Sequence, residues 1–230
     1  MSHRKASSAN VAPRLHLGCG ERYLDGYINI DFPLDQHSVQ VRNRADLHAD
    51  IRLLDYPEGS GAEVRSHHMF EHFDRPTALA LLIRWQRWLQ PGGRLIIETP
   101  DFGRSVRAFF LRRNARAREV ILRHLFGSHE AGWAYHLDGW YKQKFERYLT
   151  ALGFDRLRFE FGRWKDTYNI TVEAHKARSF ASLDEATAIA DALMEWSLVD
   201  HSESEMRMLA VWKAELRRRL AAKAGPVATA

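Results

Sequence analysis

The chain has 230 residues, enough for one domain with additions and a substantial buried core. Its 45% hydrophobic and 27% charged residues are ordinary for a soluble globular protein. The net charge of +5 suits an acidic partner without requiring one, and the single cysteine, Cys19, excludes an internal disulfide and a cysteine-based zinc cluster.

Residues 1–13 are polar and contain several serines, and we expect a disordered arm there. They lack the apolar core of a signal peptide, and no uninterrupted apolar run elsewhere is long enough to span a bilayer. We therefore expect a cytoplasmic protein without a membrane span.

An apolar strand then runs into a Gly-x-Gly turn. Residues 14–17 form the strand, Gly18 and Gly20 form the turn, and a second strand at residues 27–30 ends on Asp31. Glycine has no Cβ, so the backbone can turn sharply there and approach a ligand closely. A carboxylate at the tip of the next strand can accept hydrogen bonds from both hydroxyls of a ribose. The pattern predicts half of a nucleoside-binding crevice at the carboxyl ends of parallel strands.

Strands and helices alternate along the next part of the chain. Strands that alternate with helices and end in a strand pair indicate an α/β sandwich with a mostly parallel sheet. In chain order the sequence predicts a short strand at 45–51, a strand that passes into a loop at 62–73, an amphipathic helix at 75–89, a turn and strand at 89–101, a basic helix at 102–126, a helix at 142–152, and strands at 154–162 and 168–175.

Two helix signals follow residue 176. Ser182 to Glu185 is a capping box that opens a helix, and Ser202 to Glu205 repeats the signal for a second helix. Gly225 and Pro226 would end the second helix. The sequence therefore predicts a helical hairpin that is appended to the α/β part of the chain.

An apolar stripe on the second of these helices requires a partner surface. We expect it to pack within the chain, against the preceding helix near Leu193 and Trp196, because two capped helices with a short connection form a natural hairpin. A second copy of the chain is the alternative partner, so both a monomer and a homodimer stay open. The stripe consists of Met206, Leu209, Trp212, Leu216 and Leu220.

The order of these motifs resembles that of the class I S-adenosylmethionine-dependent methyltransferases. The similarity is greatest to their small bacterial branch, whose first motif reads LxLGCG, here Leu15 to Gly20, and whose loop after the fourth strand reads hxxEH, here ending in Glu71 and His72. The resemblance implies a Rossmann-like sandwich with a mostly parallel seven-stranded sheet over residues 14–176 and a C-terminal helical appendage over residues 177–230. It also implies S-adenosylmethionine as the cofactor.

The resemblance further implies a set of cofactor-binding residues. The glycine turn would frame the methionine end, and Asp31 would bind the ribose hydroxyls. Asp50, with the amide of Ile51, would meet the adenine edge, although Asp46 competes for that role and an acid there can instead cap a turn. The complete set is Leu17, Gly18, Cys19, Gly20, Asp31, Asp50, Ile51, His67 and His68.

The connection between the first two strands departs from the family pattern. It leaves little room for a crossover helix, which parallel strands normally require. We therefore expect the amides of Cys19, Gly20 and Glu21 to serve the cofactor in place of a helix N-terminus.

Aromatic and histidine side chains gather between Ser128 and Tyr141, after the fifth strand ends on Asp101. Histidine titrates near neutral pH, so His136 or His129 is a candidate general base for an acceptor hydroxyl. The alternative is a packed loop in a reaction that depends on positioning alone. The candidate catalytic residues are His136, His129 and Asp101.

The loop after the fourth strand raises the alternative of a metal site. His68, Glu71 and His72 are spaced so that they can share one helical face, and such residues can hold a cation. The further acids and histidines that such sites require downstream are not assignable in the sequence. We therefore expect His72 to order the loop by hydrogen bonding and assign no metal.

The segment at residues 102–126 is strongly basic. Arginine binds phosphates through two N–H groups, so an anionic acceptor is one interpretation, and a solvated helix face is the other. The arginines are Arg104, Arg107, Arg112, Arg113, Arg116, Arg118 and Arg123.

These observations favour a methyltransferase that acts on a small or carrier-linked acceptor. Relatives of the branch belong to envelope-glycan and natural-product pathways, which implies a sugar or natural-product hydroxyl. An RNA methyltransferase is one alternative because the chain is basic, but no recognisable RNA-binding module is present, and we expect no nucleic-acid partner. A non-catalytic cofactor-binding or assembly protein is the other, and the intact glycine turn and Asp31 count against it.

Overall fold

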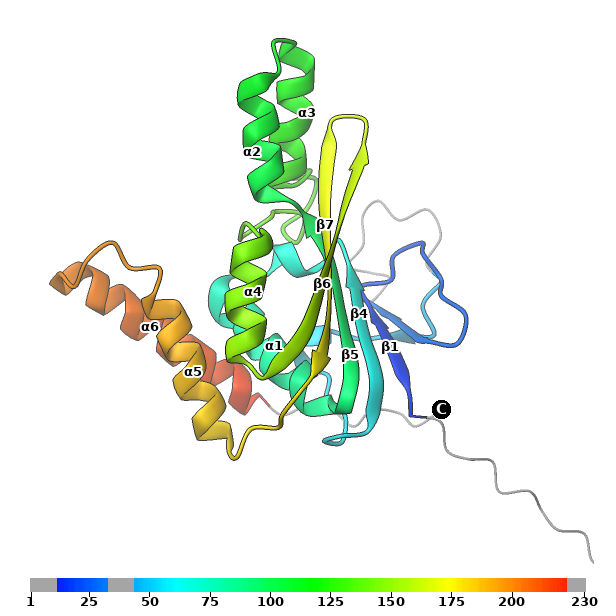
Figure 1. Cartoon of the computed structure of the whole chain (residues 1–230), viewed down its shortest axis with the longest axis vertical. Helices are drawn as coiled ribbons and strands as arrows, with labels where there is room; N and C mark the ends of the chain where they lie inside the picture. The colour runs from blue at the N-terminus through cyan, green and yellow to red at the C-terminus, as the bar shows by residue number, and fades with distance from the viewer. Residues whose placement is uncertain (1–11, 33–43, 223–230) are drawn as a thin grey trace, which may run out of the picture.

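The computed structural model describes residues 12–32 and 44–222 of the chain (Figure 1). The expected N-terminal arm as far as Val11, and the helix-ending Gly225 and Pro226, lie outside these residues. Within the described ranges, no helix has the length and apolarity that a membrane crossing requires.

A seven-stranded sheet forms the centre of the described part of the chain (Figure 1). β1 to β5 run parallel to one another, whereas β7 is antiparallel to both β5 and β6. The order β3-β2-β1-β4-β5-β7-β6 confirms the predicted α/β fold with a mostly parallel sheet. The strands are β1 (Arg14–Leu17), β2 (Ile28–Asp31), β3 (Leu47–His48), β4 (Gly61–His67), β5 (Leu89–Pro100), β6 (Phe154–Trp164) and β7 (Thr167–Lys176).

Helices flank this sheet, but the connection between β1 and β2 contains none, as its short length predicted. The remaining boundaries lie close to the predicted ones. The helices are α1 (Arg75–Trp88), α2 (Phe102–Leu111), α3 (Ala115–Phe126), α4 (Lys142–Ala151), α5 (Leu183–Glu195) and α6 (Glu203–Ala221), with short 3-10 helices η2 (Ile51–Leu53) and η3 (Phe70–His72).

The single basic helix predicted at residues 102–126 is wrong, because α2 and α3 are separate helices. Asn114 lies at the break, and its side chain accepts hydrogen bonds from the amides of Arg116 and Ala117. This bonding caps α3 and starts a new helix. The two helices project beyond the sheet, next to the hairpin of β6 and β7 (Figure 1).

α1 is buried on nearly all sides, which differs from the amphipathic helix predicted. It packs against the sheet and against α5 and α6 (Figure 1), and a helix in such a position is expected to be apolar all round. Arg84 of α1 is buried as well. Its guanidinium donates to the backbone carbonyls of Arg219 and Ala222 at 2.6 and 3.0 Å, and it thereby satisfies carbonyls at the end of α6.

α5 and α6 form the predicted hairpin, and the apolar stripe of α6 packs within the chain except for Met206, which is 41% exposed. Leu209 and Leu216 are buried, and Trp212 is half-buried against the same core. Leu193 is buried as predicted, but Trp196 is wrong as a partner because its side chain is 69% exposed. The reason is that α6 packs mainly on α1.

The two predicted capping signals behave differently. The hydroxyl of Ser182 accepts a hydrogen bond from the amide of Glu185 at 3.1 Å and caps α5. The side chain of Ser202 makes no such bond at the start of α6. The carboxylate of Glu205 instead accepts the amide of Val199 at 3.0 Å, which ties α6 to the connection before it.

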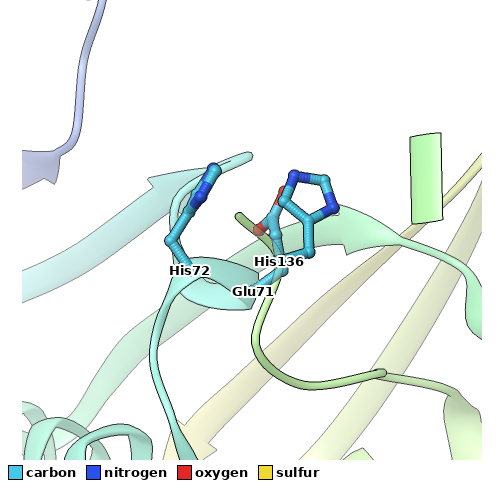
Figure 2. Close-up of side chains that lie close together, drawn as sticks. All are labelled: Glu71, His72 and His136. Atoms are coloured by element: carbon cyan, nitrogen blue, oxygen red, sulfur yellow. The ribbon is translucent and has the colours of Figure 1, made fainter. Parts of the chain in front are cut away.

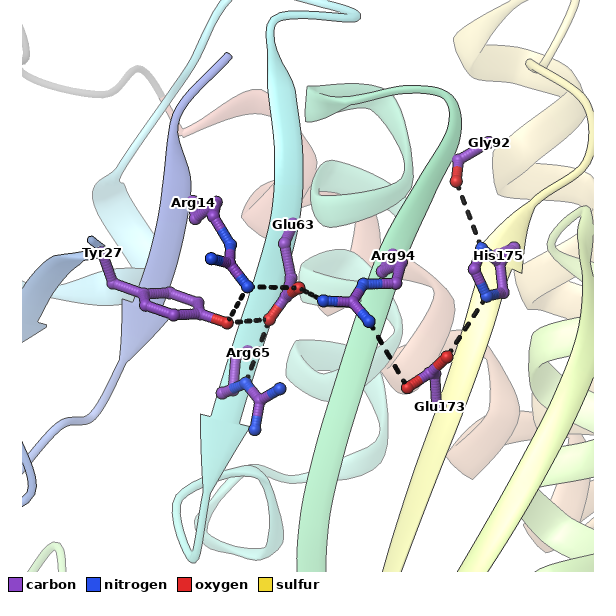
Figure 3. Close-up of polar contacts among 8 residues, drawn as sticks. All are labelled: Arg14, Tyr27, Glu63, Arg65, Gly92, Arg94, Glu173 and His175. Atoms are coloured by element: carbon purple, nitrogen blue, oxygen red, sulfur yellow. Dashed lines mark hydrogen bonds and ion pairs between the residues drawn. The ribbon is translucent and has the colours of Figure 1, made fainter. Parts of the chain in front are cut away.

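The face of the sheet away from these helices carries a row of charged side chains (Figure 3). Successive side chains of a strand point to opposite faces of the sheet, so apolar side chains gather on one face and charged side chains on the other. Arg14 of β1 lies opposite Glu63 of β4, and Glu63 lies opposite Arg94 of β5. Arg94 also pairs with Glu173 of β7 at 3.8 Å, so the row crosses the middle of the sheet.

Glu63 is the centre of this row and is 1% exposed. Its carboxylate accepts hydrogen bonds from the Tyr27 hydroxyl and the Arg94 guanidinium, from Arg65 Nε at 3.0 Å and from Arg14 at 3.4 Å. Burial alone would raise the pKa of Glu63. The bond from Tyr27 and the charges of Arg65 and Arg94 outweigh burial, so the pKa lies below its ordinary value.

Glu63→Gln should lower the free energy of unfolding by about 1–3 kcal/mol, because it leaves charged donors without their anion. The arginines are partly exposed, so the full cost of an orphaned buried charge is not expected. Because the pKa of Glu63 is lower in the folded protein than its ordinary value of 4.5, ionised Glu63 stabilises the fold above about pH 4.5. This stabilisation is lost as the pH falls from there through the folded pKa. Urea unfolding of both proteins at neutral pH and at about pH 3.5 should show the difference shrink in acid. A difference independent of pH would contradict the role of the charge.

Leu216→Ala should cost about 2–5 kcal/mol of stability, because Leu216 is fully buried where α6 packs on the core. Val211→Ala is the matched control on the same helix, since the Val211 side chain is 66% exposed, and it should cost less than about 0.5 kcal/mol. Denaturant unfolding of the two variants measures both values. Equal costs would mean that α6 does not depend on this packing.

Candidate functional site

The carboxyl ends of β1 to β5 lie at one edge of the sheet, and polar side chains gather there. From β1 the chain order proceeds outward through β2 and β3 on one side, and through β4 and β5 on the other. The boundary between β1 and β4 is therefore the switch point, where ligands of such sheets bind. Gly18 follows β1, and His68 follows β4, at this boundary.

The glycine turn is held to the end of β2 by its own amides. Gly18 and Gly20 have φ values of 67° and 54°, a region that favours glycine. The amides of Gly18 and Cys19 donate to the Ile30 carbonyl at 2.9 and 3.1 Å, and the Gly20 amide donates to Asp31 Oδ2 at 2.9 Å. The amides of Cys19 and Gly20 are thus engaged within the turn, where we expected them to serve a ligand.

Cys19 lies in this turn with its thiol buried. Burial raises the pKa of Cys19 to about 12, and the nearby carboxylates of Asp31 and Asp46 add to this effect. The thiol is therefore neutral at physiological pH, which disfavours a nucleophilic role because the thiolate is the reactive form.

Asp31 is buried at the tip of β2. Its Oδ2 accepts the Gly20 amide and its Oδ1 accepts the Phe32 amide at 2.8 Å. The carboxylate thereby fixes the glycine turn at the carboxyl end of β2.

Asp50 and Asp46 have different local partners. Asp50 accepts the Arg52 amide at 2.9 Å, which caps η2, and its carboxylate forms a two-bond pair with the Arg52 guanidinium. Asp46 accepts the amide and the side-chain Nδ2 of Asn29 at 2.8 and 3.0 Å. Asp46 therefore holds β2, while Asp50 caps η2.

His67 and His16 form a buried pair beneath the glycine turn. His67 Nδ1 lies 3.0 Å from His16 Nε2, and His16 Nδ1 lies 3.0 Å from the side-chain oxygen of Asn29. Burial, with the charge of Arg22, lowers the pKa of His67 to about 3, so its ring is neutral.

His68 lies between two carboxylates at the end of β4. Its Nδ1 is 3.3 Å from Glu71 Oε1, and its Nε2 is 3.2 Å from Glu98 Oε1. Burial would lower the pKa of His68, but the bonds to Glu71 and Glu98 outweigh it and raise the pKa to about 10. The same contact with His68 lowers the pKa of Glu98 to about 2. His68 is therefore an imidazolium that links the two acids.

A pocket of about 240 Å³ lies next to His68 and Glu71. It brings together η3, α3 and the segment before α4, which are distant in the sequence. Figure 2 shows Glu71, His72 and His136 directed toward one another at this place. The lining residues are His68, Glu71, His72, Arg123, His124, Gly127, Ser128, Trp133, Ala134 and His136.

Two backbone contacts join the loop after β4 to the aromatic segment. The carbonyl of Glu71 accepts the Leu137 amide at 2.8 Å. The Nδ1 of His72 donates to the Tyr135 carbonyl at 3.0 Å. The predicted role of His72 in ordering the loop by hydrogen bonding is thereby confirmed, and the same bonds bring His136 to within 3.9 Å of Glu71.

Of the three candidate catalytic residues, the structure brings only His136 to the pocket. His129 donates from Nε2 to the Phe126 carbonyl at 2.8 Å and stacks on Tyr135 with ring centres 4.4 Å apart. The buried Asp101 carboxylate accepts the Arg104 amide at 3.0 Å and caps α2. His129 and Asp101 are thus engaged in holding the ends of α3 and α2.

Sequence reasoning missed His124 and Glu98. His124 reaches the pocket from α3, which the prediction treated only as a basic helix. Glu98 interrupts the apolar run of β5 just before its end. An acid within a buried strand is a signal that could have identified Glu98, because buried charges require a partner.

No protein-family model matches the sequence, and no curated protein sequence matches it either. The structure is similar to that of an S-adenosylmethionine-dependent methyltransferase from Archaeoglobus fulgidus, with 15% identity, a TM-score of 0.50, and 73% of this chain and 87% of that chain covered. A methyltransferase from Methanosarcina mazei gives 14% identity, a TM-score of 0.47 and coverages of 71% and 92%. The chain spans 64% of the length of a possible exported protein from Bordetella parapertussis, with 74% of this chain covered, 19% identity and a TM-score of 0.46. The first of these similarities shows that this chain has the Rossmann-like fold of the class I methyltransferases.

Gly18→Ala should destabilise the protein more than Gly26→Ala does. Both positions have positive φ, at 67° and 78°, so each substitution carries a backbone cost of about 1–2 kcal/mol. A Cβ at Gly18 would lie 2.6 Å from Met69 Cγ, whereas a Cβ at Gly26 meets nothing within 4 Å. We expect a further 1–3 kcal/mol, approximately, for Gly18 alone. Denaturant unfolding measures the loss of stability in both variants. Equal losses would mean that Met69 and the loop after β4 move aside without a cost in free energy.

Proposed function

We propose that the chain is an S-adenosylmethionine-dependent methyltransferase that acts on a hydroxyl of a small or carrier-linked acceptor, of the sugar or natural-product class. The observation that carries this proposal is the glycine turn bonded to the buried Asp31 at the switch point of the sheet. The proposal treats residues 14–176 as the methyltransferase domain and residues 177–230 as its appendage.

The residues at the switch point fit this cofactor. At Gly18 a Cβ would lie only 2.6 Å from Met69 Cγ, and φ is positive, so the turn that would frame the cofactor requires glycine at this position. Asp31 presents acceptors for two ribose hydroxyls. The proposed cofactor residues are those of the sequence prediction, namely Leu17, Gly18, Cys19, Gly20, Asp31, Asp50, Ile51, His67 and His68.

Bound S-adenosylmethionine would supply a sulfonium methyl group, whose C–S bond breaks with its electron pair left on sulfur as the acceptor oxygen bonds to the carbon and loses its proton. The chain's own contribution is to position the acceptor and to receive that proton. His136 is the candidate for the second role, because burial lowers its pKa and keeps the ring neutral beside the pocket. His129 and Asp101, the other candidate catalytic residues, would act indirectly, by holding the ends of α3 and α2.

Arg123 supports an anionic acceptor, because it is the arginine of the basic segment that lines the pocket. Other arginines of the segment have partners of their own. Arg112 pairs with Asp166 at 3.1 Å, and Arg118 donates to the Phe109 carbonyl at 3.2 Å. The acceptor that fits this arrangement has a phosphate or carboxylate near its reacting hydroxyl.

Asp31→Ala should weaken S-adenosylmethionine binding by about 10- to 150-fold, which corresponds to the loss of about 1.5–3 kcal/mol in hydrogen bonds to a charged group. Isothermal titration calorimetry on the folded variant measures the loss. Glu63→Gln is the control, because Glu63 lies near the start of β4, away from the carboxyl edge, and its loss affects stability only. Absence of binding to the parent protein would overturn the proposed function, and full affinity in Asp31→Ala would remove Asp31 from the site.

A further inference from the structure

We propose that Glu71, His72 and His136 bind a divalent transition-metal ion of the zinc class in the pocket that all three line. Each of the three residues offers one ligand atom, and these atoms lie within 4.8 Å of one another. They come from η3 and from the segment before α4, and Figure 2 shows their side chains grouped together. The site is inferred from these residues alone and does not depend on the proposed methyl transfer.

The first support is a buried carboxylate oxygen that lacks a partner. Glu71 is 2% exposed, and its Oε2 has no hydrogen-bond donor among the described residues. His136 Nδ1 is buried and unpartnered in the same way. An unsatisfied buried polar atom costs about 1–3 kcal/mol, and more when the group is charged. A bound cation would offset this cost for Glu71, because it supplies the positive charge that the oxygen lacks.

The second support is the way in which the ligands are oriented. His72 donates from Nδ1 to the Tyr135 carbonyl, so its Nε2 keeps the lone pair that a metal requires. Histidine ligands of metals almost always donate their other nitrogen to a carbonyl or carboxylate in this manner. Glu71 Oε1 is held by His68 at 3.3 Å, which fixes the carboxylate while Oε2 stays available.

The ligand set determines which ion is expected. Two imidazole nitrogens and one carboxylate match the ligands of catalytic zinc sites, whereas Mg²⁺ and Ca²⁺ prefer oxygen ligands. Zinc bonds of about 2.0–2.2 Å require the ligand atoms to approach each other by about 1 Å from the present spacing. His136 Nε2 lies 3.9 Å from Oε1, the other oxygen of the same Glu71 carboxylate, so the imidazole is already next to the ligating group. Three protein ligands leave a coordination position open toward the pocket.

The open position gives the ion a use that rests on the proposed function. An acceptor hydroxyl bound there would lose its proton to water more readily, because a metal lowers the pKa of an oxygen that it ligates. The resulting alkoxide, held beside the switch point, would be the nucleophile toward the methyl group. His136 would then act as a metal ligand and not as the proton acceptor.

Titration of metal-free full-length protein with Zn²⁺ by calorimetry tests the site, and Co²⁺ serves as a spectroscopic probe. We expect a tight site for one ion per chain, visible Co²⁺ absorption, and no displacement by equimolar Mg²⁺. His136→Ala and Glu71→Gln should each weaken Zn²⁺ binding by about 100-fold or more. His201→Ala is the control, because His201 is 77% exposed and lies outside the pocket, and it should retain the affinity.

Circular dichroism establishes whether each variant is folded. If Glu71→Gln does not fold, the His136→Ala variant alone decides the test. Absence of tight Zn²⁺ binding would overturn the proposal, as would affinity that His136→Ala leaves unchanged or that Mg²⁺ abolishes. S-adenosylmethionine affinity, measured on the same metal-free protein, separates the two proposals. Zinc binding without S-adenosylmethionine binding would leave the metal site standing and remove the methyltransferase.

Discussion

Glu71 is 2% exposed, and its side chain and backbone together join the loop after β4 to a distant segment of the chain. Its side chain binds His68 of the same loop, and its backbone carbonyl accepts the amide of Leu137. Next to it, His72 binds the carbonyl of Tyr135, 63 residues further along the chain. The pocket exists because these bonds hold the loop after β4 against the segment before α4.

The two ends of β4 have different roles, one in stability and the other in the candidate site. Near the start of this strand, Glu63 pairs with Arg14 of β1 and Arg94 of β5 on the face that none of the described helices covers (Figure 3). At its end, His67 contacts His16 of β1, and His68 lines the pocket. A parallel sheet normally has helices on both faces. Here the absence of a helix between β1 and β2 leaves polar side chains to cover part of one face.

Local patterns were sufficient to predict most of the fold. The glycine turn, the paired strands at the end and the helical hairpin each depend on residues that are neighbours in the sequence. Asn114 shows where this reasoning stopped, because its cap on α3 competes with continuous helix propensity over the same basic stretch. Trp196 shows a second limit: the stripe of α6 was identified, but its main partner, α1, lies far away in sequence.

The candidate site was predicted less completely, because residue type does not reveal whether a side chain is already engaged. Asp101 and His129 have the chemistry of catalytic residues, yet the structure uses them to hold the ends of α2 and α3. Their partners are backbone groups that any sequence of this shape must satisfy. The contact of His136 with Glu71 depends on tertiary folding and has no local signature.

Unused bonding capacity is therefore a better guide to this site than residue type. Most acids at the carboxyl edge accept hydrogen bonds from nearby amides or guanidinium groups, as Asp46 and Asp50 do. Among the described residues, buried polar side-chain atoms without a partner include Glu71 Oε2 and His136 Nδ1, and both belong to residues that line the pocket. Glu71 Oε2 is the one carboxylate oxygen among these buried unpartnered atoms, and a cation that binds there would recover the cost of its burial.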